Sequence, residues 1–91
     1  MSRNRDLVVR EIDAQLFLIN EERGTIHHLN ETASAIWRLL KEPATANSII
    51  QTFRFLYPEE NVWYLKKSIR SLLRDLTDKR ILVRKRRRKV N

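Results

Sequence analysis

The feature that most constrains the fold is a change of hydrophobic periodicity within residues 24–40, GTIHHLNETASAIWRLL. The part up to Leu29 is typical of a β-strand, and the part from Glu31 onward repeats apolar residues at the spacing of an α-helix. Asn30 lies at the joint, and asparagine is well suited to cap a helix by accepting a hydrogen bond from a backbone N–H in the first turn. The sequence therefore predicts a short strand that leads directly into a helix.

Two more strand candidates precede this joint. The runs DLVVREI (6–12) and QLFLIN (15–20) are rich in β-branched and aromatic residues, and only Asp13 and Ala14 separate them, which favours a hairpin. The second run carries apolar residues on both faces, as a central strand does. Gly24, the only glycine in the chain, ends the turn EERG and supplies the positive φ that a hairpin loop needs. The first 29 residues thus predict a small antiparallel meander.

Three amphipathic segments follow the meander and predict three helices. The first is expected to end at Pro43, the second to begin after a cap at Thr45, and the third to open at PEEN (58–61) with acidic residues in its first turn. The residues expected to face the core recur at helical spacing: Ala33, Ile36, Trp37 and Leu40 in the first helix; Ile49, Ile50, Phe53 and Leu56 in the second; and Val62, Leu65, Ile69, Leu72, Leu73 and Leu76 in the third.

Two features near the third helix leave alternatives open. Trp63 and Tyr64 lie off its apolar face, and they either contact a partner or cover the open end of a small core. The segment RILVRK (80–85) is either a last strand or a wing. The predicted order is β-β-β-α-α-α, with or without a final strand.

The charge of the chain is concentrated at its C-terminal end. Residues 1–78 contain eleven basic and eleven acidic residues, so the formal charge of +8 comes entirely from residues 79–91. We expect one folded domain over residues 1–83 and a basic, disordered tail over residues 84–91. Neither an apolar run of membrane-spanning length nor a signal peptide is present, which favours a cytoplasmic protein.

The residue types leave little room for catalysis. With no cysteine, the chain has neither a disulfide framework nor a thiolate zinc site, and one glycine cannot make a glycine-rich phosphate loop. His27 and His28 are neighbours on a predicted strand, so their side chains point to opposite faces and do not form a joint site. We therefore expect no catalytic residue, no metal site, no cofactor and no enzymatic activity.

The stretch LNETA, residues 29–33, followed by Ile36-Trp37, resembles the signature of the PqqD family. These are small peptide chaperones of pyrroloquinoline quinone (PQQ) biosynthesis and the related recognition elements of ribosomally made, post-translationally modified peptides (RiPPs). The spacing of apolar residues agrees from about residue 7 to residue 83. This chain departs from the family at Arg80, where glycine is common, and in its long basic tail; lasso-peptide recognition proteins share much of the same pattern.

The resemblance implies an α+β fold, in which a three-stranded antiparallel sheet packs on three helices in a winged-helix-like arrangement. It also implies a non-catalytic function. The leader of a precursor peptide would add as a strand along the third strand, beside the third helix, and be presented to a modifying enzyme, often a radical-SAM protein. The residues placed at this peptide-binding site are Thr25, Ile26, His27, His28 and Leu29 as the edge, Ile69 and Leu73 as the floor, and Lys66, Arg70 and Arg74 as a cationic rim.

Two other functions remain open at the level of the sequence. A winged-helix nucleic-acid-binding protein would use the third helix and the basic tail, although the neutral charge of residues 1–78 argues against it. A domain that only bridges two enzymes is a third reading. An unpaired sheet edge also permits either a monomer or an edge-to-edge dimer.

Overall fold

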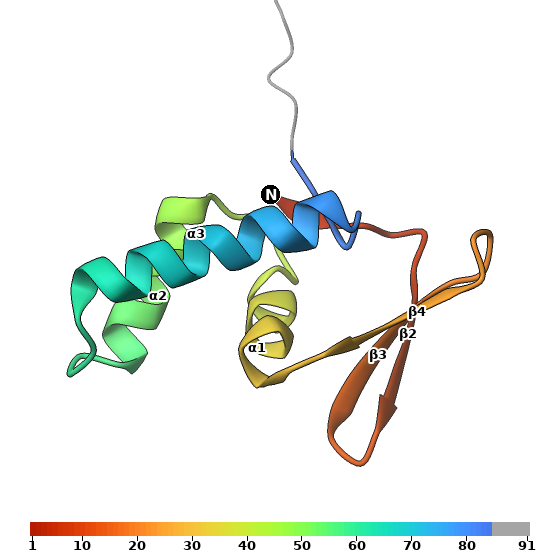
Figure 1. The fold of residues 1–91 in the computed structure, drawn as a ribbon, viewed down its shortest axis with the longest axis horizontal. Coiled ribbons are helices and arrows are strands. Elements are labelled where there is room, and N and C mark those ends of the chain that lie inside the picture. Colours follow the sequence, from red (N-terminus) through yellow and green to blue (C-terminus); the bar gives the residue numbers. More distant parts are fainter. Residues whose placement is uncertain (85–91) are drawn as a thin grey trace, which may run out of the picture.

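The computed structural model describes residues 1–84, so the predicted tail at 84–91 lies outside the described residues except for Arg84. Its three helices and its antiparallel sheet of three strands confirm the predicted α+β fold. Figure 1 shows the helices grouped on one side, with the sheet projecting from them beside α1. None of the helices in residues 1–84 is long and apolar enough to span a lipid bilayer.

The sheet consists of β2 (Val8–Ile12), β3 (Gln15–Asn20) and β4 (Thr25–Leu29), in the order β2-β3-β4. The central position predicted for the second run is confirmed, and its Leu16 and Leu18 are buried against the helices. The β2–β3 turn consists of Asp13 and Ala14 at φ values of 52° and 64°, and Gly24 has a φ of 67°. Both tight turns therefore require the left-handed backbone region, which only Gly24 enters without a steric cost.

The helices are α1 (Glu31–Leu39), α2 (Ala46–Leu56) and α3 (Val62–Asp78). The predicted caps are confirmed, since Asn30 accepts a hydrogen bond from the Ala33 N–H and Thr45 accepts one from the Ser48 N–H. The predicted start of the third helix is wrong by a few residues. Its N-cap is Asn61, so the acidic residues of PEEN precede the helix and none lies in its first turn.

The core lies between the helices and one face of the sheet, and the predicted apolar residues largely fill it. Leu56 and Val62 are exceptions, because they are 55% exposed at the end of α2 and 36% exposed at the start of α3. Trp37 is buried, whereas Trp63 and Tyr64 are 79% and 66% exposed and so do not cover the core. The described residues that form the core are Leu7, Leu16, Leu18, Leu29, Ala33, Ile36, Trp37, Leu40, Ile49, Ile50, Phe53, Leu65, Ile69, Leu73, Leu76, Ile81 and Leu82.

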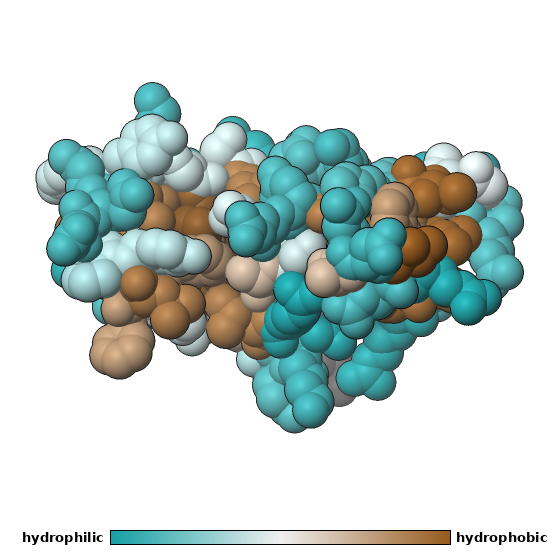
Figure 2. Space-filling model, turned by 90° about the horizontal axis from the view of Figure 1, so that it is seen from below, coloured by the Kyte–Doolittle hydropathy of each residue, from teal (hydrophilic) through white to brown (hydrophobic). Residues whose placement is uncertain are grey.

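Apolar side chains also remain on the surface. The view from below shows them gathered at one end of the molecule, over the α2–α3 connection, and at the other end, over the sheet (Figure 2). Phe55 and Tyr57 are exposed at the first end, and Ile12 and Ile26 at the second.

A second, two-stranded sheet joins the two ends of the described chain. β1 (Ser2–Arg3) pairs antiparallel with β5 (Leu82–Val83), with Ser2 opposite Val83. A final strand within RILVRK is thus confirmed, but its partner strand at the N-terminus was missed. β5 pairs with β1 and not with the three-stranded sheet, so β4 has β3 as its one strand neighbour among residues 1–84.

Candidate functional site

The open edge of β4 is the first part of the candidate site. Along its other edge β4 pairs with β3 through five residues, from Leu16 opposite Leu29 to Asn20 opposite Thr25. Its outer edge leaves backbone N–H and C=O groups without a strand partner in the described part of the chain. Such an edge can accept an added strand whose backbone supplies the missing hydrogen bonds.

The junction of β4 with α1 holds this edge in place. The Asn30 Oδ1 accepts a hydrogen bond of 2.8 Å from the Ala33 N–H, which fixes the first turn of the helix. The Ser34 hydroxyl, buried in the same turn, donates a hydrogen bond of 3.2 Å to the Leu29 carbonyl. The end of the strand is therefore tied to the helix at two points, and Ser34 was not singled out from the sequence. In the sequence, Ser34 is distinguished only by being a polar residue next to the apolar residues that were expected to face the core.

A groove of about 300 Å³ runs between β4 and the C-terminal half of α3. Leu72, Leu76 and Ile81 line it from the α3 side, and residues 26–29 of β4 line it from the sheet side. Its helical wall also carries an ion pair, in which the Lys79 Nζ lies 3.1 Å from the Asp75 Oδ2. Both of these side chains are about half exposed, so the pair contributes little to stability, about 0–1 kcal/mol.

The end of α3 shapes this groove through a Schellman motif. The Ile81 N–H donates to the Leu76 carbonyl at 2.9 Å and the Arg80 N–H donates to the Thr77 carbonyl at 3.0 Å. Arg80 takes the left-handed position of the motif, at a φ of 60°. The turn brings Ile81 back against Leu76, and both side chains line the groove. The family's usual glycine at this position is explained by the same backbone conformation.

The N-terminal segment stabilises the turn at the end of α3 through hydrogen bonds from Asn4. The Asn4 side chain donates a hydrogen bond of 2.7 Å to the Arg80 carbonyl, and the Asn4 N–H donates one of 3.0 Å to the Ile81 carbonyl. The pairing of β1 with β5 continues directly from these bonds. The groove wall formed by the end of α3 is thus anchored by residues about 75 positions away in the chain.

The residues expected at the site on β4 lie along its open edge. Ile26, His27, His28 and Leu29 line the groove, and Thr25 begins the strand. His27 is half-buried, while the His28 ring lies 4.9 Å from the Phe17 ring on the neighbouring strand. The two histidines point to opposite faces of the sheet, and no cluster of three or more potential metal ligands occurs in residues 1–84.

The residues expected on α3 are not brought to the groove. Ile69 and Leu73 are 2% exposed and belong to the core. Arg70 lies on the side of α3 that faces α2, where it donates a hydrogen bond of 3.2 Å to the Asn47 Oδ1. Arg74 lines a small hollow together with Arg70 and Arg84.

The third cation of that flank, Lys66, lies 5.6 Å from the centroid of the Trp63 ring. Near β4 the helix presents Leu72, Asp75, Leu76 and Lys79 instead. A role of Lys66, Arg70 and Arg74 in peptide binding stays a prediction, and the structure gives them no contact with the β4 groove.

The fold and the site together define a small winged-helix-like domain with an open sheet edge beside a groove. A comparison with known protein families identifies the family of this domain. The model of the family described as coenzyme PQQ synthesis protein D (PqqD) matches residues 15–82, and the chain belongs to the PqqD family.

A solved structure agrees with this assignment. The structure described as TbiB1 in complex with the TbiA(beta) leader peptide matches with a TM-score of 0.76 and 26% sequence identity, over 89% of this chain and 93% of that chain. A comparison with curated proteins gave no match.

Proposed function

We propose that this protein is a non-catalytic peptide chaperone of RiPP biosynthesis. It binds the leader of a ribosomally made precursor peptide as an added strand along β4 and presents it to a modifying enzyme. The observation that carries the proposal is the open edge of β4 beside the α3 groove, in a chain that resembles TbiB1, whose structure contains a leader peptide. The nucleic-acid alternative receives no support from the family match or from the structural match.

The groove indicates how the leader is held. Backbone hydrogen bonds along β4 supply attraction that depends little on the leader's sequence, and side chains on one face of the leader enter the groove. One or two aliphatic anchors against Leu72, Leu76 and Ile81 would contribute about 1.5–3 kcal/mol each. After the cost of ordering a flexible peptide, a Kd of about 1 μM, equivalent to about −8.2 kcal/mol, is the expected scale.

The proposal also covers the cellular location of the protein, the enzyme that receives the peptide and the oligomeric state. The chaperone acts in the cytoplasm, and the enzyme that receives the peptide is a radical-SAM protein or another RiPP-modifying enzyme encoded beside it. The protein works as a monomer when the leader occupies β4, because an edge-to-edge dimer through β4 would use the same backbone groups.

A matched pair of substitutions tests the site. Ile26 and Ile12 are both exposed isoleucines on edge strands, at 66% and 57%, but Ile26 lies on β4 and lines the groove whereas Ile12 lies on β2. With a leader peptide from an adjacent precursor gene, calorimetry should show that Ile26→Asp weakens binding at least tenfold and that Ile12→Asp leaves it unchanged. Equal effects of the two substitutions would refute the assignment of the peptide to the edge of β4.

A second variant tests the cations predicted from the sequence. Lys66, Arg70 and Arg74 are not among the residues that line the groove, so replacing all three by alanine should leave leader binding within about twofold. A loss of more than tenfold, with Ile26→Asp harmless, would move the peptide site to that flank of α3.

A further inference from the structure

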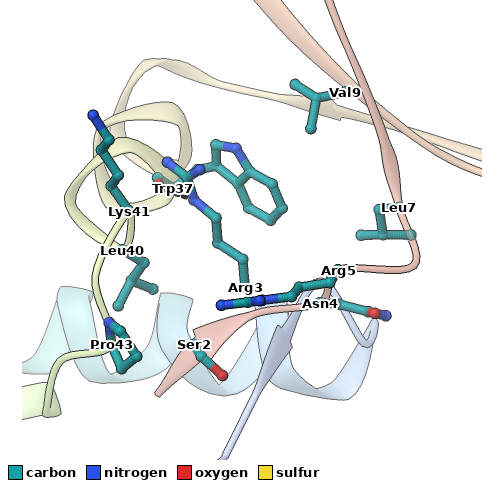
Figure 3. Close-up of a pocket in the computed structure, with 10 residues that line it drawn as sticks. All are labelled: Ser2, Arg3, Asn4, Arg5, Leu7, Val9, Trp37, Leu40, Lys41 and Pro43. Carbon is teal, nitrogen blue, oxygen red and sulfur yellow. Dashed lines mark hydrogen bonds between the residues drawn. The ribbon is translucent and has the colours of Figure 1, made fainter.

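A second pocket, of about 340 Å³, shares no lining residue with the groove beside β4 (Figure 3). It is formed by β1, the segment that leads into β2, and the C-terminal end of α1, with Leu7, Val9 and Leu40 among its apolar lining. Because the sheet order is β2-β3-β4, the pocket lies beside the strand at the opposite edge from β4. A peptide added along β4 therefore leaves it open.

Arg3 is held rigidly within this pocket. Its Nε donates a hydrogen bond of 2.8 Å to the Trp37 carbonyl, and its guanidinium carbon lies 4.9 Å from the centroid of the Trp37 ring. Figure 3 shows the side chain extending across the pocket to the indole. Its two terminal amino groups make no hydrogen bond to another described residue, so they remain available as donors for a ligand.

The charge of the pocket is uncompensated. Arg3, Arg5 and Lys41 line it, and none of the acidic residues within positions 1–84 does. The ion pairs among residues 1–84 are Arg38 with Glu11 and Lys79 with Asp75, so none of the three cations has a partner there. Burial lowers the pKa of Arg3, yet arginine stays protonated at neutral pH. An anion in the pocket would offset the cost of this partly desolvated cation.

Trp37 contributes a second feature of the pocket lining. Its side chain is 95% buried, and its indole N–H donates to no acceptor within residues 1–84. All side-chain nitrogen and oxygen atoms that are fully enclosed in that part of the chain have a partner, so this N–H must reach solvent. Trp37 also lines the pocket beside Arg3, so a ligand bound there would lie near the indole, whose N–H is an unused donor.

We propose that this pocket binds a carboxylate, supplied by an aspartate or glutamate side chain of the modifying enzyme. A planar carboxylate can accept two parallel hydrogen bonds from a guanidinium, and the apolar walls suit the methylene groups that carry it. The enzyme would dock beside β2 while the leader lies along β4, so one molecule holds both partners at once. The identity of the partner rests on the proposed function, whereas the carboxylate chemistry rests on the pocket alone.

The two tryptophans allow a direct test. In the ¹⁵N-labelled full chain, each indole N–H gives its own NMR signal, and Trp63, exposed and close to Lys66, is an internal control for unspecific attraction to a cation. At constant ionic strength, the blocked peptide acetyl-Leu-Glu-Leu-amide should shift the Trp37 signal with saturation near 1 mM, a scale suited to so small a ligand. The Trp63 signal should not move, and acetyl-Leu-Gln-Leu-amide should bind at least tenfold more weakly.

Variants separate the pocket from the rest of the surface. Lys41→Gln and Arg5→Gln should each weaken the Glu peptide several-fold, and Lys66→Gln should have no effect. Parallel shifts of both indole signals, or equal binding of the Glu and Gln peptides, would overturn the proposal. Inorganic phosphate that moves the Trp37 signal more strongly than the Glu peptide would overturn the assignment to a carboxylate.

A last pair of measurements distinguishes failure of this proposal from failure of the proposed function. The double substitution Arg5→Glu and Lys41→Glu should abolish binding of the adjacently encoded modifying enzyme while the leader's Kd stays unchanged. Enzyme binding that survives this charge reversal would refute the docking site. If instead the Glu peptide binds the pocket but no leader moves the amides of residues 25–29, the chaperone function fails and the carboxylate site stands.

Discussion

Replacing Arg80 by glycine should stabilise this protein. Arg80 occupies the left-handed position that ends α3, at a φ of 60°, where a side chain brings Cβ too close to its own backbone. That conformation costs a residue other than glycine about 1–2 kcal/mol. Glycine avoids this cost, but it makes the unfolded chain more flexible, and this lowers the free energy of unfolding by about 0.5–1 kcal/mol.

The expected net gain is therefore about 0.5–1 kcal/mol, because nothing else at this position is lost. The Arg80 side chain is exposed and makes no ion pair within residues 1–84, and both of its backbone bonds, to Thr77 and from Asn4, survive in glycine. For a domain of this size, 1 kcal/mol corresponds to about 4–8 °C in the melting temperature. Urea denaturation and a thermal melt followed by circular dichroism would measure both quantities.

Two controls isolate the backbone effect. Arg80→Ala removes the positive charge but keeps a Cβ in the strained region, so its stability should stay close to that of the parent. Lys79→Gly places glycine one residue earlier, at an ordinary φ of −80°, and removes the ion pair with Asp75, so it should be destabilising. If Arg80→Gly proves no more stable than Arg80→Ala, the reasoning from backbone strain is refuted.

Three further substitutions test the sheet and its junction with α1. Asn30→Ala removes the hydrogen bond from the Ala33 N–H and should cost about 0.5–2 kcal/mol, and an unchanged thermal melt would contradict the capping role. Ala14→Gly relieves a φ of 64° in the β2–β3 turn and should raise the urea midpoint by an amount equivalent to about 0.4–1 kcal/mol; a lower midpoint would argue against strain there. Ser34→Ala removes the buried bond to the Leu29 carbonyl and should cost about 1 kcal/mol, with faster amide exchange in β4; unchanged exchange would show that the bond does not hold the strand.

Local features could be predicted well from the sequence. The turn at Asp13-Ala14, the glycine at 24 and the cap at Asn30 each depend on a few neighbouring residues, and all three lie where they were expected. The central position of the second strand was also evident, because apolar residues on both faces need cover on both sides.

Distant pairings could not be predicted in the same way. β1 and β5 have two residues each and are nearly 80 positions apart, so neither carries a pattern that reveals the other. For the same reason, the residues of α3 that line the groove beside β4 could not be predicted from the sequence. Periodicity fixes the angles between Lys66, Arg70 and Leu72 around the helix, but it does not say which flank of α3 faces the sheet.

The pairing of Ser2 with Val83 has a consequence for protein engineering. Because these positions are neighbours in space, a short linker can join them, and new ends can be opened at the Asp13-Ala14 turn to give a circularly permuted domain. For the same reason, a second protein fused before residue 2 or after residue 83 would be attached at nearly the same point. Either order of fusion should then give the attached protein a similar reach toward the bound peptide.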